Sequence, residues 1–340
     1  MERACRQEVT PPAKRPKSLF MKQLPRATIH LSNIVSNWQA LDGLHPGATT
    51  AAVVKADAYG LGAVPVARAL LRSGCSTFFV AYLEEALAVR KALGLGPRIF
   101  VLNGPTRKEM SAYIAAGITA VLSSPDHLKA WANAPKGTSA LHFDTGMNRL
   151  GLKAAALATT LTDLQRLQPV LVMSHLACAD ETGNAMNTAQ LKAFDDIASA
   201  FPDTPASLAN SAGCYLGKGF GYDLIRPGIG LYGGSLPPKG LRIKQALTLD
   251  AAILSVFEGK AGETVGYGAT QTLQQDTQLA TVGIGYADGL PRTGGNNLVA
   301  YLDDVPCPVV GRISMDLTTI DVSKAQDKAK TGARVEFIGE

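Results

Sequence analysis

The sequence predicts an α/β protein in which a barrel of eight alternating strands and helices is followed by an all-β domain. Three observations support this prediction. Eight short apolar runs recur between residues 49 and 233, several segments between them have helical periodicity, and the pattern changes after Pro237-Pro238. Apolar residues at successive positions, rather than at alternate ones, are typical of strands buried on both faces of a parallel sheet.

The apolar runs are spaced roughly 25 residues apart, which matches the ~250 residues of a complete (β/α)8 TIM barrel. The eight expected strands lie within 49–56, 77–81, 98–104, 119–124, 139–146, 170–177, 205–211 and 224–233. The clearest helical patterns cover 63–73, 83–93, 107–116 and 188–201. Eight units favour a closed barrel over an open doubly wound sheet.

Three regions are expected along the chain. Residues 1–20 are polar, basic and proline-containing, which predicts a disordered N-terminal extension. Met21 is a candidate start as well as Met1, because an ordered pattern begins directly after it. Residues 21–235 form the expected barrel. In residues 236–340 apolar and polar residues alternate more, and the segment is rich in Thr, Val and Ile and interrupted by Gly, Pro and Asp. This pattern predicts a β-rich C-terminal domain.

Composition excludes several classes of protein. Hydrophobic residues make up 46% of the 340 residues and charged residues 18%, so a large core can be buried. Much of the net charge of +5 lies near the N-terminus, which leaves no basic surface for nucleic acid. No apolar run approaches the roughly 20 residues of a membrane span, and no secretory signal is evident. The five widely spaced cysteines predict neither a disulfide framework nor a metal site, and indicate a reducing, cytoplasmic location.

Lys55 is the first candidate catalytic residue, because it follows the apolar run of the first expected strand. Burying an ammonium group is costly and lowers its pKa, which makes the amine a nucleophile for carbonyl compounds, including a pyridoxal aldehyde. A lysine that extends to solvent from a strand end is the structural alternative. The carboxyl end of a barrel strand is where active sites form, and this favours a catalytic role.

Polar residues follow the other expected strands in the same way. In this fold the loops after strands seven and eight frequently bind phosphate, and Asn210, Ser211 and the Gly228-Ile229 backbone supply suitable donors. Taken singly, His175 could be a core histidine and residues 210–213 a turn. Together the strand ends predict a ligand with a phosphate group next to a lysine, and they contribute Asp144, Thr145, Arg149, His175, Asn210, Ser211, Arg226 and Gly228.

Ordered sequence blocks resemble those of the alanine racemases, which are fold-type III pyridoxal-phosphate enzymes. The blocks are VVKADAYGLG, HFDTGMNRLG, SHLACAD, NSAG, RPGIGLYG, VGYGATQ, GYADGLPR and GRISMDL. They cover roughly residues 21–340, and their shared order is far more specific than KADAYG alone. The resemblance implies an isomerase that uses pyridoxal 5'-phosphate to interconvert L-alanine and D-alanine, the latter for cell-wall peptidoglycan. It also implies a homodimer in which the β domain of one subunit completes the active site of the other.

The resemblance also implies roles for individual residues. Racemisation removes a proton from one face of Cα and returns one to the other, so it needs two bases, which correspond to Lys55 and Tyr267. A free phenol has a pKa of about 10, and His175, between Tyr267 and Arg226, is expected to assist it. Arg226 faces the pyridine nitrogen, where it can only donate a hydrogen bond. The expected phosphate contacts are Tyr59, Ser211, Gly228 and Ile229, and the expected substrate contacts are Arg149, Met315 and Asp316.

The sequence departs from the family pattern at four points. His142 stands where many members have a carbamylated lysine that orients the neighbouring arginine, so an anion such as chloride, a water molecule or Asp144 is expected to orient Arg149 instead. Leu61 and Ser314 replace a frequent histidine and a frequent cysteine. The chain ends at VEFIGE, before the closing strands of the family's β domain, so this domain is expected to be truncated, with unpaired strand edges.

Three alternatives remain open from the sequence. A serine racemase or a racemase of broad specificity differs in pocket volume, which the sequence does not give. An amino-acid decarboxylase of the same fold is disfavoured, because those enzymes have an acidic residue where Arg226 stands. A non-catalytic pyridoxal-phosphate-binding protein is the alternative of another class, and the second domain with Tyr267 argues against it.

Overall fold

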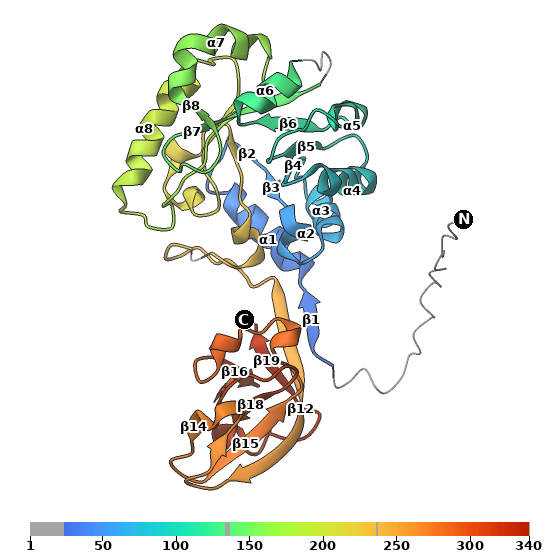
Figure 1. Cartoon of the computed structure of the whole chain (residues 1–340), viewed down its shortest axis with the longest axis vertical. Helices are drawn as coiled ribbons and strands as arrows, with labels where there is room; N and C mark the ends of the chain where they lie inside the picture. Colours follow the sequence, from blue (N-terminus) through green and yellow to red (C-terminus); the bar gives the residue numbers. More distant parts are fainter. Residues whose placement is uncertain (1–23, 133–136, 236, 340) are drawn as a thin grey trace, which may run out of the picture. The chain divides into compact units, whose positions relative to one another are not determined.

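The computed structural model describes residues 24–132, 137–235 and 237–339 (Figure 1). The expected N-terminal extension, residues 1–20, and Leu236 at the expected domain boundary lie outside the described residues. The described chain divides into two compact units. One comprises Thr28–Thr248, and the other combines Leu249–Gly339 with the residues before Thr28.

The larger unit is the predicted barrel. Its parallel strands follow the order β3-β4-β5-β6-β7-β9-β10, with the short β8 (Leu152–Lys153) beside β7. β11 pairs in parallel with β2, and the main-chain N–H of Arg226 donates to the carbonyl of Ala209 beyond β10, so hydrogen bonding closes the ring. The strands are β2 (Thr49–Thr50), β3 (Ala52–Val53), β4 (Thr77–Val80), β5 (Arg98–Val101), β6 (Thr119–Leu122), β7 (Ser139–Asp144), β9 (Val172–Met173), β10 (Ala206–Ser207) and β11 (Leu224–Ile225). Each lies within one of the eight predicted runs, and the predicted fold class is confirmed.

Helices surround the barrel strands (Figure 1). Each of the four predicted helical stretches overlaps one helix, namely α3 (Ala63–Arg72), α4 (Leu83–Leu93), α5 (Met110–Ala115) and α8 (Ala185–Ser199), and only α8 begins before its predicted stretch. Helix α1 (Leu31–Asp42) was not predicted from the sequence, although its buried Ile34, Trp38 and Leu41 have helical spacing. Helices α6 (Pro125–Trp131) and α7 (Leu157–Arg166) were not predicted either. α6 begins with a proline after Ser124, whose hydroxyl accepts the N–H of His127, a common N-terminal arrangement.

The barrel interior is filled by alternate strand residues. Phe79 and Phe100 stack with ring centroids 4.6 Å apart, and Ala51 and Ala140 belong to the same buried cluster. Small residues beside large ones allow the tapered interior to fill without a pore. The packed interior fixes the strand ends, and the loops that follow them are therefore anchored on a rigid frame.

The smaller unit is an antiparallel sheet with strand order β17-β16-β19-β12-β15-β18, and β1 also pairs with β12. Its strands are β1 (Arg26–Ile29), β12 (Leu247–Gly259), β15 (Thr277–Val282), β16 (Val299–Leu302), β17 (Val305–Pro308), β18 (Thr318–Asp321) and β19 (Arg334–Ile338). A separate hairpin joins β13 (Thr264–Val265) to β14 (Gln271–Thr272). Within residues 249–339 the only helical segments are short 3-10 turns. Across the described ranges, no helix is both long enough and apolar enough to cross a membrane.

Candidate active site

A cavity of about 700 Å³ lies within the barrel unit, at the carboxyl ends of the strands. Nine of the residues that the sequence analysis selected line it together. They are Lys55, Tyr59, Arg149, His175, Asn210, Ser211, Arg226, Gly228 and Ile229. Parallel barrel strands bring their carboxyl ends to one rim, which explains why residues so distant in sequence share one cavity.

Lys55 begins an unusual turn, labelled α2 (Lys55–Tyr59). Residues 56–59 all have positive φ angles, between 51° and 58°, and so form a left-handed turn without a glycine. Such a conformation costs roughly 1–2 kcal/mol per residue. Glu85 on α4 holds the turn in place, because its carboxylate accepts the main-chain N–H of Ala56 at 2.6 Å and that of Ala81 at 2.7 Å. The turn therefore fixes where the Lys55 side chain enters the cavity.

The environment of Lys55 favours its neutral amine. The residue is half-buried, and burial lowers its pKa most, followed by repulsion from the Arg149 guanidinium, while Glu85 acts in the opposite direction. A lowered pKa increases the fraction of unprotonated amine near neutral pH. This is the form that attacks a carbonyl carbon.

Arg226 is buried among neutral groups. Only 4% of the residue is exposed, and its guanidinium donates to the hydroxyl of Ser207 and to the carbonyl oxygen of Ser174. Burial lowers the pKa of Arg226 to about 10, so it remains protonated at neutral pH. The pKa of His175 is lowered by burial first and then by Arg226, which keeps this imidazole neutral.

A second corner of the cavity carries hydrogen-bond donors. The hydroxyl oxygen of Ser211 accepts the N–H of Gly228 at 2.8 Å and that of Gly230 at 3.0 Å, which leaves its own proton to donate elsewhere. A Cβ atom on Gly228 would lie 2.3 Å from the hydroxyl oxygen of Tyr59, so glycine is required for this close approach. The two hydroxyl groups and the backbone at Gly228-Ile229 form a cradle suited to an anion.

Asn210 lines the cavity, but its amide is occupied by the protein. Its Oδ1 accepts the N–H of Gly213 at 2.9 Å and its Nδ2 donates to the carbonyl of Leu176 at 3.3 Å. These bonds shape the turn after β10, which begins the 3-10 segment Gly213–Tyr215. Its direct contribution to a ligand therefore stays a prediction.

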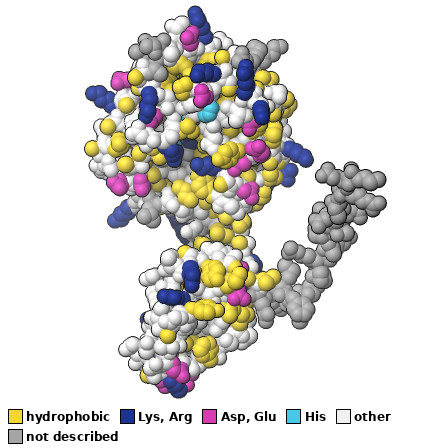
Figure 2. Space-filling view, in the orientation of Figure 1, with side chains coloured by type: hydrophobic (Ala, Val, Ile, Leu, Met, Phe, Trp, Pro, Cys, Tyr) yellow, Lys and Arg dark blue, Asp and Glu magenta, His cyan; other side chains and the backbone are white. Residues whose placement is uncertain are grey.

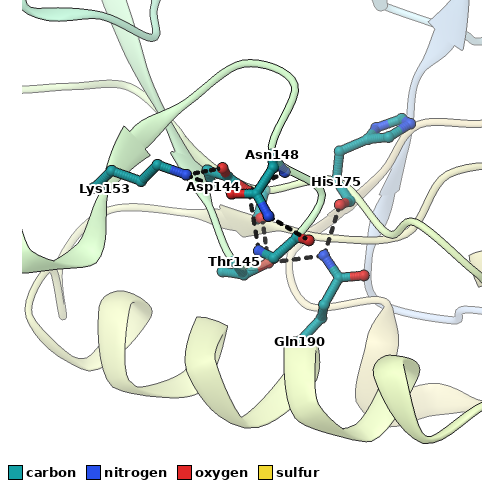
Figure 3. Close-up of polar contacts among 8 residues, drawn as sticks. Asp144, Thr145, Asn148, Lys153, His175 and Gln190 are labelled. Atoms are coloured by element: carbon teal, nitrogen blue, oxygen red, sulfur yellow. Dashed lines mark hydrogen bonds and ion pairs between the residues drawn. The ribbon is translucent and has the colours of Figure 1, made fainter.

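The loop after β7 carries Arg149, and Asp144 organises it (Figure 3). The Asp144 carboxylate accepts the N–H of Gly146 and of Asn148, both at 3.0 Å, and the ammonium of Lys153 at 2.5 Å. Burial alone would raise the pKa of Asp144, but these hydrogen bonds outweigh it and lower the pKa to about 2. Asp144 therefore stabilises the loop by binding main-chain N–H groups of the loop and the side chain of Lys153.

His142, one of the predicted departures from the family pattern, is 7% exposed. Within the described part of the chain, its Nδ1 has no hydrogen-bond partner. Burial, followed by the charges of Arg226 and Arg149, lowers the pKa of His142 to about 3. It is therefore a neutral imidazole at neutral pH.

The remaining predicted residues lie in the C-terminal unit and are exposed. Tyr267 is 68% exposed and Met315 60%. Tyr267 opens the 3-10 turn Tyr267–Ala269, which follows β13. Met315 and Asp316 occupy a loop whose carbonyl at Met315 accepts the N–H of Ala287. Hydrophobic side chains gather on the visible face of this unit (Figure 2).

Several residues that shape the cavity were missed by the sequence analysis, namely Phe79, Glu85, Ser174, Gln190 and Ser207. Gln190 carried a usable signal, because it shares a buried helical face with Phe194 and Ile197 at spacings of four and seven residues. A glutamine in such an apolar stripe needs buried hydrogen-bond partners. Glu85 carried no such signal, since glutamate in the first turn of a helix is common.

Comparison with known proteins identifies relatives over both units. The N-terminal domain of alanine racemase matches residues 29–236, and the C-terminal domain matches residues 246–340. The chain is 45% identical over 324 residues to the alanine racemase of Rhodospirillum rubrum, covering 92% of this chain and 86% of the relative. It is 46% identical over 323 residues to that of Acidiphilium cryptum, covering 93% and 90%. The crystal structure of alanine racemase from Bartonella henselae with covalently bound pyridoxal phosphate superposes with a TM-score of 0.86 at 35% identity, covering 93% and 90%.

The strain in the turn after Lys55 is testable by replacement with glycine. Ala56 is exposed and has a φ of 51°. We expect Ala56→Gly to raise the free energy of unfolding by up to about 1 kcal/mol, because glycine adopts this conformation without steric cost. Ala88→Gly, at an exposed position within α4, should instead lower it by about 1 kcal/mol. Urea denaturation measures both, and equal destabilisation by the two variants would contradict a strained turn.

The buried neutral His142 predicts a pH dependence of stability. The pKa of His142 in the folded protein is about 3, below the ordinary value of about 6.5 for histidine in an unfolded chain. The neutral imidazole therefore makes its full contribution to the free energy of unfolding above about pH 6.5, and this contribution decreases as the pH falls towards 3. We expect His142→Leu to gain about 2 kcal/mol relative to the unmodified protein between pH 7 and pH 5. Urea denaturation of the cofactor-free proteins at the two pH values measures this difference. Parallel losses of stability in both proteins would rule out a buried neutral imidazole.

Proposed function

The chain belongs to the alanine racemase family, and from this premise we propose that it interconverts L-alanine and D-alanine with pyridoxal 5'-phosphate. The observation that carries the proposal is the charge of the barrel cavity. Three basic residues, Lys55, Arg149 and Arg226, line the cavity. Among its lining residues the acidic one is Asp180, which is exposed. A cavity with this balance favours ligands that combine a carbonyl group with anionic groups. The cofactor supplies an aldehyde and a phosphate, and alanine supplies a carboxylate.

The residues present fit the cofactor. A volume of about 700 Å³ is within the range of small-molecule sites. Lys55 would hold the aldehyde carbon, the cradle of Tyr59, Ser211 and the Gly228-Ile229 backbone would receive the phosphate, and Arg226 would face the ring nitrogen. When bound, the cofactor withdraws electrons from Cα of the substrate and so makes its proton removable.

Two bases then carry out the reaction on opposite faces of Cα. The neutral amine of Lys55 removes or returns the proton on one face. The phenolic oxygen of Tyr267 does so on the other, with the neutral His175 placed next to Arg226 to assist it. Arg149 binds the substrate carboxylate and holds Cα between the two bases.

Arg226 restricts the reaction to proton transfer. Because it stays protonated, it would donate a hydrogen bond to the ring nitrogen and could not accept one from a protonated nitrogen. The nitrogen would then stay unprotonated, which would limit the withdrawal of electrons into the ring. Side reactions such as transamination need stronger withdrawal, and a racemase benefits from their suppression.

A homodimer supplies the second base in this proposal. The exposure of Tyr267 and Met315 supports it, because both side chains are available to another copy of the chain. In a two-fold dimer, residues of the C-terminal unit of each subunit would complete the cavity of the other. Met315 and Asp316 would then border the substrate. We place the enzyme in the cytoplasm, where the free thiols of Cys75, Cys178, Cys214 and Cys307 would stay reduced and D-alanine would enter peptidoglycan synthesis.

Replacement of Tyr267 tests the assignment of the second base. We expect Tyr267→Phe to lower kcat by about 10²–10⁴-fold, since it removes the group that moves the proton on one face of Cα. Cofactor content, measured by absorbance, should stay unchanged. Tyr301→Phe provides the matched control, because Tyr301 is an exposed tyrosine on β16 of the same unit. Chiral chromatography of the alanine product measures kcat, and an equal rate in both variants would exclude Tyr267 as a base.

Mixing two inactive variants tests the shared site. Lys55→Ala and Tyr267→Phe are each expected to be inactive, but a mixed dimer would hold one site with both residues intact. After the mixture is unfolded and refolded together, random pairing predicts recovery of about a quarter of the unmodified activity. Refolding each variant alone is the control. A mixture that stays inactive, while unmodified protein refolds to full activity, would show that the two bases come from the same subunit.

A further inference from the structure

We propose that Gln190 is a positioning residue that holds Arg149 and His175 at the substrate side of the cavity. The inference rests on the proposed function and extends it to a residue of α8 that does not line the cavity. Figure 3 shows its amide pointing between two loops, one after β7 and one after β9.

The Gln190 amide binds the two loops at three points. Its Nε2 donates to the hydroxyl of Thr145 at 3.1 Å and to the carbonyl of His175 at 3.0 Å. Its Oε1 accepts the N–H of Ala177 at 2.8 Å. Both N–H donors of the Gln190 amide and one lone pair of its oxygen are therefore used. All three hydrogen bonds run from helix α8 to the loops at the cavity rim.

Burial makes the loss of these hydrogen bonds costly. Gln190 is fully buried, with 0% of its surface exposed. In this environment the loss of the amide would leave the Thr145 hydroxyl, the His175 carbonyl and the Ala177 N–H without that partner, and unpaired buried polar groups are costly. The two loops would therefore shift to recover hydrogen bonds.

The contacts continue from Gln190 to the cationic groups of the cavity. The hydroxyl groups of Thr145 and Ser174 lie 2.8 Å apart, and the carbonyl of Ser174 accepts a hydrogen bond from Arg226. A Cβ atom on Gly146 would lie 3.8 Å from Cγ of Gln190, so the loop that leads to Arg149 passes close to the same side chain. Gln190 thus ties together the loops after β7 and β9, which carry Arg149 and His175.

The phosphate cradle is built independently of Gln190. Its groups come from the turn after Lys55 and from the segments after β10 and β11, and they bind one another through Ser211. A change at Gln190 should therefore weaken binding of the substrate carboxylate more than binding of the cofactor, because Gln190 reaches Arg226 only indirectly, through Thr145 and Ser174. A purely structural role would not separate these two affinities.

The experiment compares four variants with the unmodified holoenzyme. Gln190→Met keeps a similar volume without hydrogen bonds, Thr145→Val removes the accepting hydroxyl and Thr145→Ser keeps it. Phe194→Leu is the structural control, since Phe194 is fully buried on the same helix. Propionate, which is alanine without its amine, is titrated calorimetrically into each holoenzyme, and pyridoxal phosphate is titrated into each apoprotein.

We expect Gln190→Met and Thr145→Val to weaken propionate binding by about tenfold, the effect of roughly one net hydrogen bond. Cofactor affinity should stay within about threefold in both. Thr145→Ser should bind propionate like the unmodified protein, and so should Phe194→Leu, even where urea denaturation shows lower stability. Unchanged propionate affinity in Gln190→Met and Thr145→Val, or equal losses of propionate and cofactor affinity, would overturn the proposal.

The unmodified protein separates this inference from the proposed function. If it binds pyridoxal phosphate and racemises alanine but the Gln190 and Thr145 variants behave like Phe194→Leu, only the positioning role fails. If the unmodified protein does not racemise alanine, the proposed function fails, and propionate affinity still reports whether Gln190 organises a carboxylate site. If Gln190→Met does not fold, the Thr145 pair decides the question, because the two substitutions differ in whether the hydroxyl remains.

Discussion

The buried guanidinium of Arg226 is the constraint on which the cavity depends. Its positive charge is held by neutral oxygens, the Ser207 hydroxyl and the Ser174 carbonyl, so its field is not cancelled by these partners. Burial, followed by that field, lowers the pKa of His142 and of His175 and keeps both imidazoles uncharged at neutral pH. Burial, followed by Arg149, lowers the pKa of Lys55, so the cavity combines a more readily deprotonated amine with fixed cations, which an anionic carbonyl ligand would satisfy.

Three side chains outside the cavity keep these groups in place. On one side, Glu85 holds the left-handed turn that directs Lys55. On the other, Asp144 and Gln190 hold the loops that carry Arg149 and His175. All three supports use side chains to bind main-chain groups, which fixes the path of the loops directly. The rigid barrel strands provide the frame to which these loops are tied.

The sequence predicted the barrel well because each strand is a continuous apolar run. It predicted the cavity residues because parallel strands place their carboxyl ends at one rim. It did not predict the left-handed turn, since residues 56–59 contain no glycine to mark positive φ angles. Gln190 could have been recognised as a buried glutamine from its place on the apolar face of its helix, but its partners, main-chain and hydroxyl groups in distant loops, could not be read from the sequence. Tyr267 was found only through family resemblance, since an exposed tyrosine between two glycines has no chemical signature of its own.

The most direct test of the account is the fate of the Cα proton of L-alanine in heavy water. Proton NMR of the cofactor-loaded protein with L-alanine would follow loss of the Cα signal, while chiral chromatography follows D-alanine. The account predicts that deuterium enters at Cα and that D-alanine forms until both enantiomers are equal. Stable cofactor binding with no exchange and no D-alanine would contradict it, because the cavity would then hold the cofactor without moving a proton.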